Sequence, residues 1–171
     1  PNLLSKAAQL GIYHRLMRHD ANTPVALPTD SFQTVYCNAA YWVENIQGFL
    51  TELARMTQPR GRIVLQVKLG AMRSCTLAPL RSLLGDRFLD IIGRGRFDTW
   101  PTLASRVEWE RRFQGAGLEV VDVFPFVSAV HAHLWDVGLR PIAPLLVRMA
   151  NGLTGENRSA IKRDWVELFM E

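Results

Sequence analysis

The sequence predicts an α/β fold, on the basis of a strand, a helix and a second strand that follow one another closely. Residues 33–37 favour a strand, and residues 63–67 form a nearly continuous apolar run of the kind found in parallel sheets that are covered on both faces. Between them, apolar residues recur at i, i+3, i+4 and i+7, namely Ile46, Phe49, Leu50 and Leu53. This spacing predicts an amphipathic helix, which Pro59 ends. The three segments therefore predict a βαβ unit, whose crossover is nearly always right-handed.

Other segments predict further helices and strands. Leucines and alanines at helical spacing over residues 3–10 predict a short helix that ends at Gly11. Residues 12–18 mix β-branched, aromatic and aliphatic residues over a strand-sized run, and residues 118–124 follow a predicted helix stop; we expect both to be strands. Residues 70–101 are interrupted by glycines, which indicates short helices within a long excursion.

The second half of the chain predicts two more helices. Leu103, Val107 and Phe113 indicate one helix before the glycines that precede residue 118. The last helix places four apolar residues on one stripe, namely Ile161, Trp165, Leu168 and Phe169. Because the sequence contains no repeat, linker or low-complexity segment, we expect residues 1–171 to form a single domain.

The composition indicates a protein with a real core. The chain has 171 residues, of which 48% are apolar and 21% charged, and these proportions argue against disorder. It contains neither an apolar run long enough to span a membrane nor the layout of a signal peptide, so we expect a cytoplasmic protein. Cys37 and Cys75 have no metal-type spacing and are expected to be reduced.

The net charge of +4 raises the question of a polyanionic partner. Much of the excess comes from arginines in one region, namely Arg87, Arg94, Arg96, Arg106, Arg111 and Arg112. The sequence lacks a basic motif with interleaved aromatic residues and has no helix-turn-helix pattern. A solvated positive face is therefore favoured over a nucleic-acid groove, which stays an alternative.

Residues 20–68 carry a resemblance to a known family. Asp20 is followed by Leu27-Pro28, by Ser-Phe-Gln-Thr-Val-Tyr at residues 31–36, by the helix, and by Pro-Arg-Gly before the apolar strand. This order resembles the second half of a class I S-adenosylmethionine-dependent methyltransferase of type 11. The Gly-Ala-Gly-Leu-Glu-Val-Val segment within residues 113–121 resembles the family's last helix-to-strand turn.

The resemblance covers residues 1–125 and implies a partial Rossmann-like sheet with helices on both faces. Residues 126–171 would form a helical C-terminal extension. Two positions depart from the family pattern: Gln33 stands where an acid is usual, and Arg60 where a second glycine is usual. We expect the second change to affect only the turn, provided that residue 60 avoids a positive φ.

The family's glycine-rich loop has no counterpart in the sequence. Gly93-Arg94-Gly95 follows no predicted strand, and the other Gly-x-Gly, Gly115-Ala116-Gly117, lies in the helix-to-strand turn named above. The resemblance therefore implies a truncated core without the family's first two strands. Because strands without neighbours expose unpaired backbone groups, we expect a homodimer or strand-exchanged oligomer, with weak or no binding of S-adenosylmethionine by this chain alone.

The resemblance also implies the residues of a cofactor site. Asp20 would accept a hydrogen bond from the adenine amino group, and the backbone N–H of Ala21 would reach a ring nitrogen. Asn38 and Ala39 would lie along the methionine portion, and Trp42 would face the sulfonium. The alternatives are a turn cap for Asp20 and a core position for Trp42.

Three residues are candidates for catalysis: His131, His133 and Tyr41. A neutral imidazole could deprotonate a bound acceptor near pH 7, although either histidine could instead be a packing or surface residue. His131-x-His133 would place both rings on one face of a strand, yet no third ligand has the spacing of a metal site, so we predict none.

The function that the resemblance implies is methyl transfer from S-adenosylmethionine to a small-molecule acceptor that the sequence does not identify. The activity is expected to be incomplete in this chain. Two alternatives remain: a non-catalytic protein-interaction module that uses residues 127–150, and a weakly basic nucleic-acid-binding domain.

Overall fold

The computed structural model describes residues 3–93 and 100–170, with the side chains of residues 165 and 168–170 left out. The chain forms two compact units. The first unit comprises residues 1–70 and 96–124, and the second unit comprises residues 71–95 and 125–171. That residues 1–171 act as a single domain stays a prediction.

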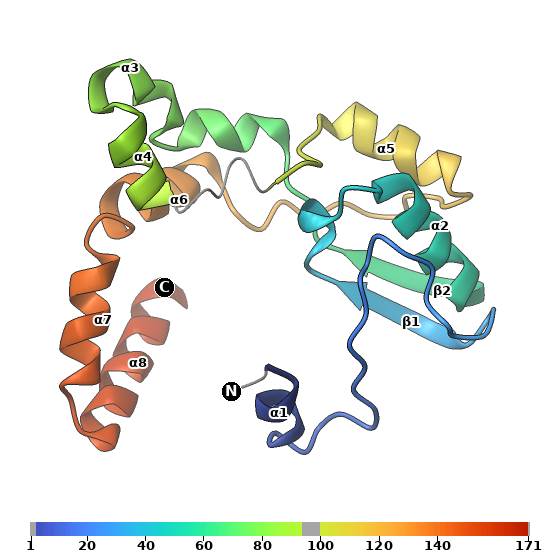
Figure 1. Ribbon diagram of the computed structural model, residues 1–171, viewed down its shortest axis with the longest axis horizontal. Coiled ribbons are helices and arrows are strands. Elements are labelled where there is room, and N and C mark those ends of the chain that lie inside the picture. The colour runs from blue at the N-terminus through green and yellow to red at the C-terminus, as the bar shows by residue number, and fades with distance from the viewer. Residues whose placement is uncertain (1–2, 94–99, 171) are drawn as a thin grey trace. The chain divides into compact units, whose positions relative to one another are not determined.

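A parallel βαβ unit forms the centre of the first unit. β1 (Phe32–Cys37) and β2 (Thr57–Leu65) pair in parallel, with Tyr36 opposite Val64, and α2 (Ile46–Met56) connects them (Figure 1). The α/β class and the strand–helix–strand order are therefore confirmed. The strand β2 begins six residues earlier than the predicted segment 63–67.

The core of the first unit lies between the sheet and two helices. Both α2 and α5 (Arg106–Gly115) contribute to it, through Leu50 at 0% exposure and Trp109 at 2%. Cys37 and Leu65 pack against the same cluster from the sheet. Both helices therefore cover one face of the sheet (Figure 1).

The opposite face of the sheet is exposed in the described structure. Tyr36 is 67% exposed, Val64 52% and Phe32 40%. These side chains alternate with the inward-facing ones, as the two-residue period of a strand requires. The residues of this face are apolar enough to pack against another surface.

The irregular first part of β2, where its pairing register with β1 shifts between Thr57 and Arg62, corrects one expectation. Arg60 stands where the family pattern has a glycine, and this change was expected to affect only the turn if the φ of residue 60 is not positive. Arg60 has a φ of 66°, so this condition is not met. Left-handed backbone strains a residue that carries a Cβ. Next to it, Gly61 lies so close to the Gln33 carbonyl oxygen that a Cβ would come within 2.8 Å of it. The family-like Pro-Arg-Gly turn thus has one strained residue and one obligatory glycine.

Two predicted strands do not form. Residues 12–18 and 118–124, all of them described, lie outside regular secondary structure. Several of their apolar side chains face solvent, with Ile12 74% exposed and Val121 92%. A segment of strand-like composition becomes a strand only when another strand pairs with it, and no described strand pairs with these segments. The N-terminal helix does form, as α1 (Leu3–Ala8).

The second unit is helical. Its elements are two 3₁₀ turns (Gly70–Cys75, which begins at the unit boundary, and Ala78–Leu80), α3 (Arg81–Leu84), α4 (Asp86–Gly93), α6 (Ala129–His133), a π-helical turn (Leu134–Leu139), α7 (Ala143–Asn151) and α8 (Gly155–Met170). Short helices after residue 70 and a helical C-terminal segment were both expected.

Parts of two expectations lie outside the described residues. They are Arg94 and Gly95 of the Gly-x-Gly segment, and the side chains of Trp165, Leu168 and Phe169 on the predicted stripe of α8.

A buried carboxylate joins the two sequence segments of the second unit. Asp136 in the π-helical turn is 3% exposed. Its Oδ2 accepts a hydrogen bond from the Leu77 backbone N–H at 3.1 Å, and its Oδ1 accepts one from Arg140 Nε at 2.7 Å. A charge at this depth is stable only with such partners. Asp136 therefore holds residues 71–80 against the C-terminal helices.

Over the described residues, no helix combines the length and the apolar character that a membrane span requires. Cys37 and Cys75 are both free and half-buried.

Candidate functional site

The candidate site lies where β1 and β2 end. Parallel strands end at the same edge of a sheet, and in open α/β sheets ligands bind beyond this edge. The two ends stay joined past the strands, because Gln66 N–H donates to the Cys37 carbonyl at 2.9 Å. Asn38 and Ala39 then follow β1 with both side chains exposed, and Lys68 follows β2.

Three aromatic rings meet at this edge, and we call them the aromatic cluster: Tyr41, Trp42 and Trp100. The Tyr41 and Trp100 ring centroids are 5.6 Å apart at an interplanar angle of 77°. Trp42 lies 5.4 Å from Tyr41 and 6.3 Å from Trp100. Tyr41 and Trp42 belong to a 3₁₀ turn after β1 (Ala40–Trp42), so the strand end itself positions two of the three rings.

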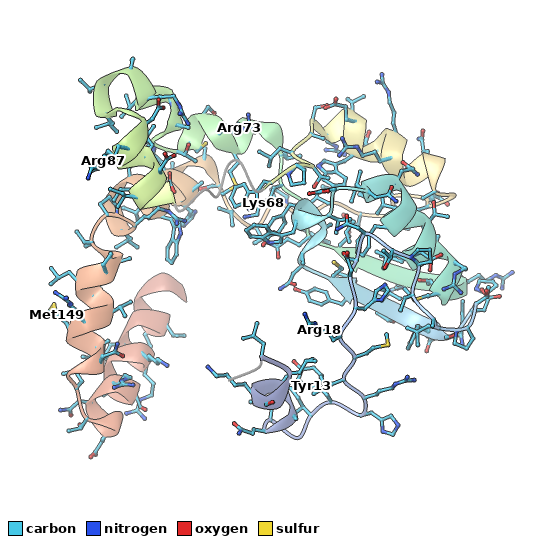
Figure 2. The ribbon with its side chains drawn as sticks, in the orientation of Figure 1. Tyr13, Arg18, Lys68, Arg73, Arg87 and Met149 are labelled. Carbon is cyan, nitrogen blue, oxygen red and sulfur yellow. The ribbon has the colours of Figure 1, made fainter. Side chains whose placement is uncertain are left out.

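The Lys68 ammonium lies against the aromatic cluster. Its Nζ is 3.8 Å from the Trp100 ring centroid and 4.2 Å from that of Tyr41, both within the range of a cation–π interaction. The structure places its side chain at the strand edge (Figure 2).

Hydrogen bonds fix the backbone around the aromatic cluster. Trp109 Nε1 donates to the Lys68 carbonyl at 3.1 Å, and the buried Thr102 hydroxyl donates to the Ala40 carbonyl at 3.1 Å. Residues 69 and 104 form an isolated parallel bridge. The segment after Trp100 is therefore attached to the chain just beyond both strands, and these contacts hold the backbone that carries the rings.

The loop that carries Asp20 attaches to the same region through Asn22. Asp20 Oδ1 accepts hydrogen bonds from both the backbone N–H and the side-chain amide of Asn22, each at 3.0 Å. Asn22 Oδ1 in turn accepts from the backbone N–H groups of Glu44 at 2.8 Å and Asn45 at 3.1 Å, at the start of α2. Asp20 is thus tied to the N-terminus of the helix that follows the aromatic turn.

The Asp20 carboxylate is exposed and ionised. The hydrogen bond from the Asn22 backbone, followed by the one from its side chain, lowers the pKa of the Asp20 carboxyl from its ordinary value of 3.8. Asp20 therefore does cap a turn, which was the alternative expected for it. Both hydrogen bonds from Asn22 reach Oδ1 of Asp20. Among the described hydrogen bonds that position this loop, none reaches Oδ2.

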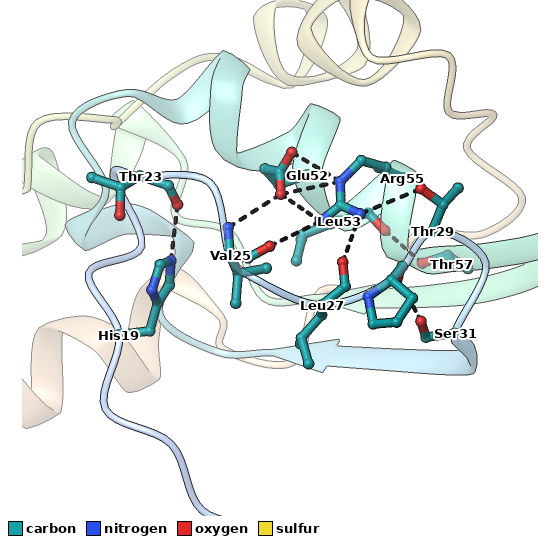
Figure 3. A network of polar contacts seen from close by, with 11 residues as sticks. His19, Thr23, Val25, Leu27, Thr29, Ser31, Glu52, Leu53, Arg55 and Thr57 are labelled. Atoms are coloured by element: carbon teal, nitrogen blue, oxygen red, sulfur yellow. Dashed lines mark hydrogen bonds and ion pairs between the residues drawn. The ribbon is translucent and has the colours of Figure 1, made fainter.

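An ion pair on α2 anchors the rest of the loop (Figure 3). Glu52 and Arg55 pair at 2.9 Å. Arg55 donates to the carbonyls of Leu27 at 2.8 Å and Val25 at 3.1 Å, and the Val25 N–H donates to Glu52 at 3.3 Å. The Arg55 hydrogen bond is the main cause that lowers the pKa of Glu52. Residues 25–27 are therefore held along α2, in the same loop as Asp20 and the half-buried Ala21.

The two histidine candidates lie in the second unit, on α6. His131 and His133 are therefore on a helix, and the expectation of a strand with both rings on one face is wrong. Positions i and i+2 of a helix point about 200° apart, at 100° per residue. The His131 Nδ1 forms a hydrogen bond with the Ser128 hydroxyl at 2.8 Å, and both histidines are exposed.

Across the described residues, no group of three His, Cys, Asp or Glu side chains is arranged to hold a metal ion.

Sequence reasoning missed two residues that shape the site. Trp100 completes the aromatic cluster at 4% exposure, and Asn22 links the Asp20 loop to α2. Residues 20–22 read Asp-x-Asn, a spacing that favours an Asx-turn. The sequence could therefore have predicted that Asn22 takes part in a turn with Asp20. Trp100 lies within an irregular segment, where helical or strand periodicity offers no guide.

The comparisons with known proteins agree with this architecture. Residues 1–65 match the family model described as "Methyltransferase domain". The fold resembles the crystal structure of the YcgJ protein from Bacillus subtilis, with a TM-score of 0.50, 21% sequence identity and coverage of 92% of this chain. The chain spans 65% of the length of that protein. A search of curated proteins finds no match. Residues 1–65 of the chain are thus similar to the methyltransferase domain family.

Proposed function

We propose that this chain provides part of an S-adenosylmethionine-dependent methyltransferase that acts on a small-molecule acceptor. The observation that carries the proposal is the meeting of three elements at one sheet edge. The turn after β1, Lys68 after β2, and the loop of Asp20 are joined by hydrogen bonds and ring contacts. This is the edge where nucleotide-type ligands bind in open α/β sheets.

The residues at this edge suit the parts of the cofactor. The ionised Asp20 carboxylate is a hydrogen-bond acceptor for the adenine amino group, and Ala21 would offer its backbone N–H. Asn38 and Ala39 present small exposed side chains for the methionine portion, and Trp42 offers a ring face that is 48% exposed. When bound, S-adenosylmethionine would supply an electrophilic methyl group.

The chain's own contribution to catalysis would be mainly positioning of the acceptor. Tyr41 is the candidate acid–base residue at the sheet edge, because it belongs to the aromatic turn and is half-buried. His131 and His133, which belong to the second unit, stay general-base candidates on their chemistry alone. We retain a cytoplasmic location as part of the proposal.

Photo-crosslinking tests the cofactor site even when binding is weak. The chain is irradiated with S-adenosylmethionine that carries a tritiated methyl group, with and without excess S-adenosylhomocysteine. Trypsin cleaves after Arg18 and Arg55 and leaves residues 19–55 as one peptide, because no lysine or arginine lies between them. We expect label that the competitor suppresses in this peptide, and label spread evenly over the chain would contradict the proposal.

A conservative variant separates recognition from folding. Asp20→Asn keeps an oxygen that can accept from Asn22, so the turn persists, but it places an amide N–H₂ where the adenine amino group would approach. We expect the label to fall several-fold. Asp30→Asn, in the same tryptic peptide, is the matched control because asparagine also tolerates the φ of 53° found at Asp30. Equal labelling of both variants would remove Asp20 from the site.

We further propose that the chain self-associates and binds S-adenosylmethionine weakly by itself. β1 and β2 form a two-stranded sheet in the described structure, and the apolar face of Tyr36 and Val64 is exposed. Open strand edges favour pairing with another chain. Sedimentation velocity should show a mass above that of the monomer. A clean monomer with micromolar affinity for the cofactor in calorimetry would contradict both expectations.

A second candidate function, a protein-interaction module, is favoured by one observation. The second unit exposes large apolar side chains, namely Val130, Leu134, Trp135, Leu145, Val147 and Met149, each at least half exposed. Met149 projects from α7 (Figure 2). If this surface is open in solution, the dye anilinonaphthalene sulfonate should bind it and Leu145→Lys should weaken the binding. An absence of dye binding would remove this candidate.

The basic residues do not favour nucleic-acid binding. Arg106 pairs with Glu110 at 2.8 Å, and Arg112 lies over the Trp109 ring at 5.0 Å and donates to the Thr102 carbonyl. Arg87 belongs to the second unit, whereas these arginines belong to the first. Heparin retention with a steep salt dependence is the result that would revive this alternative.

A further inference from the structure

The side-chain amide of Asn22 joins two parts of the candidate site. Its Oδ1 accepts hydrogen bonds from the backbone N–H groups of Glu44 at 2.8 Å and Asn45 at 3.1 Å. An amide oxygen has two lone pairs, so these two donors occupy it. Because two N–H groups can face only an acceptor, they also fix the orientation of the amide. Its NH₂ group therefore points the other way, toward Asp20.

The NH₂ group and the backbone N–H of Asn22 both donate to the same oxygen of Asp20. The two nitrogens, Nδ2 and N, each lie 3.0 Å from Oδ1. Each oxygen of an ionised carboxylate accepts about two hydrogen bonds, so Oδ1 is fully used inside the loop. Since the described hydrogen bonds of this loop reach only Oδ1, Oδ2 is the oxygen that a ligand would meet.

The element that holds the Asn22 amide is part of the packed structure. Asn45 is the N-cap residue of α2, where its side chain accepts from the Gly48 N–H at 3.2 Å. The same helix buries Leu50 in the core of the first unit. A side chain on a loop keeps a defined direction only when a rigid element supports it. Asn22 thus transmits the position of the α2 N-terminus to the Asp20 carboxylate.

We propose that Asn22 is the positioning residue of the Asp20 site, where it fixes Oδ1 and leaves Oδ2 directed toward a hydrogen-bond donor of the ligand. A carboxylate that is already oriented loses less conformational freedom when a ligand binds, so the affinity rises without a new contact. The inference rests on the proposed function for the identity of that donor, the adenine amino group. It goes further because it gives a role to a residue that acts only through Asp20.

Asn22→Asp separates this role from a structural one. The new carboxylate still accepts from Glu44 and Asn45, and the Thr23 N–H still closes the turn on the Asp20 carbonyl at 3.0 Å. The group that donated to Asp20 Oδ1 becomes a negative charge that repels it. Carbon-13 NMR of the carboxyl groups, without any ligand, should therefore show a raised pKa for Asp20. Hydrogen exchange of the Glu44 and Asn45 amides should stay as slow as in the unaltered chain.

An unchanged pKa of Asp20 in the folded variant would overturn the proposal. If Asn22→Asp does not fold, the unaltered chain decides. The side-chain NH₂ signals of Asn22 should then follow the titration of the Asp20 carboxyl, because the two groups are hydrogen-bonded. Signals that do not change through this titration would show that the amide does not orient Asp20.

Photo-crosslinking with labelled S-adenosylmethionine measures the consequence for the ligand. We expect Asn22→Asp to reduce the competitor-sensitive label in the peptide of residues 19–55 by about tenfold, the effect of one hydrogen bond to a charged group. Gln33→Glu is the matched control, because it also turns an exposed amide into a carboxylate within this peptide, and it should leave the label unchanged. Equal labelling of the two variants would overturn the proposal. An unaltered chain that takes no such label would instead refute the proposed function, and the titration of Asp20 then decides the role of Asn22.

Discussion

Replacing Gly61 with alanine should loosen the turn that begins β2. A Cβ at this position would lie 2.6 Å from Thr57 Cγ2 and 2.8 Å from the carbonyl oxygens of Gln33 and Gln58. Two of these three atoms are backbone, and they belong to both strands, so relief requires a shift of the sheet itself. Overpacking of this kind costs about 1–3 kcal/mol, and the reduced freedom of the unfolded chain returns about 0.4–1 kcal/mol. We therefore expect a net loss of about 1–2 kcal/mol.

Urea unfolding measures this loss. With a slope of about 2 kcal/mol per molar urea, the midpoint should fall by about 0.5–1 M. Hydrogen exchange should assign the loss to amides of β1 and β2. Gly155→Ala is the matched control, because a Cβ at Gly155 meets nothing within 4 Å and its helical position favours alanine. Our reading of the turn is refuted if Gly61→Ala is as stable as the unaltered chain.

Three more predictions concern single contacts. Arg60→Gly should relieve the left-handed strain and raise stability by about 0.5–1 kcal/mol in the same urea assay, and a loss would show that the arginine side chain stabilises the turn. Asp136→Ala should destabilise the second unit by about 3 kcal/mol, since it leaves Arg140 without its buried partner; thermal unfolding would check this, and a neutral effect would contradict it. Glu52 has a pKa below its ordinary value of 4.5, mainly because Arg55 donates to it, so its contribution is present above that value and is lost as the pH falls through the lowered pKa. Glu52→Gln should therefore flatten the acid side of the stability profile, and an unchanged slope would exclude the pair as its source.

The βαβ unit could be predicted because its determinants are local. The helix α2 buries Ile46, Leu50 and Leu53, which are residues of the stripe read from the sequence. The two strands carry apolar residues next to a helix that brings them together. Helical periodicity and short connections need no knowledge of distant residues.

The failures arose where distant residues decide the structure. Residues 12–18 have strand-like composition, but a strand forms only with a partner, and composition does not specify one. In α5, Val107 was expected on the apolar stripe and is 55% exposed, whereas Trp109, which that stripe omitted, is 2% exposed. Trp109 is buried because its indole reaches the Lys68 carbonyl, a contact across 41 residues.

The site was predictable in part for the same reason. Positions after each strand follow from the strand ends, so Asn38, Ala39, Tyr41 and Trp42 were identified from the sequence. The contact between Lys68 and Trp100 joins two segments that are distant in the sequence. Neither helical nor strand periodicity predicts such a contact.

The discontinuous composition of the two units affects how the protein can be dissected. The chain passes from one unit to the other at residues 70–71, 95–96 and 124–125. A single proteolytic cut therefore liberates neither unit. A fragment that ends at residue 70 would lack α5 and its tryptophan, and one that starts at residue 125 would lack the segment that Asp136 binds. Each unit would have to be produced as a permuted or spliced polypeptide.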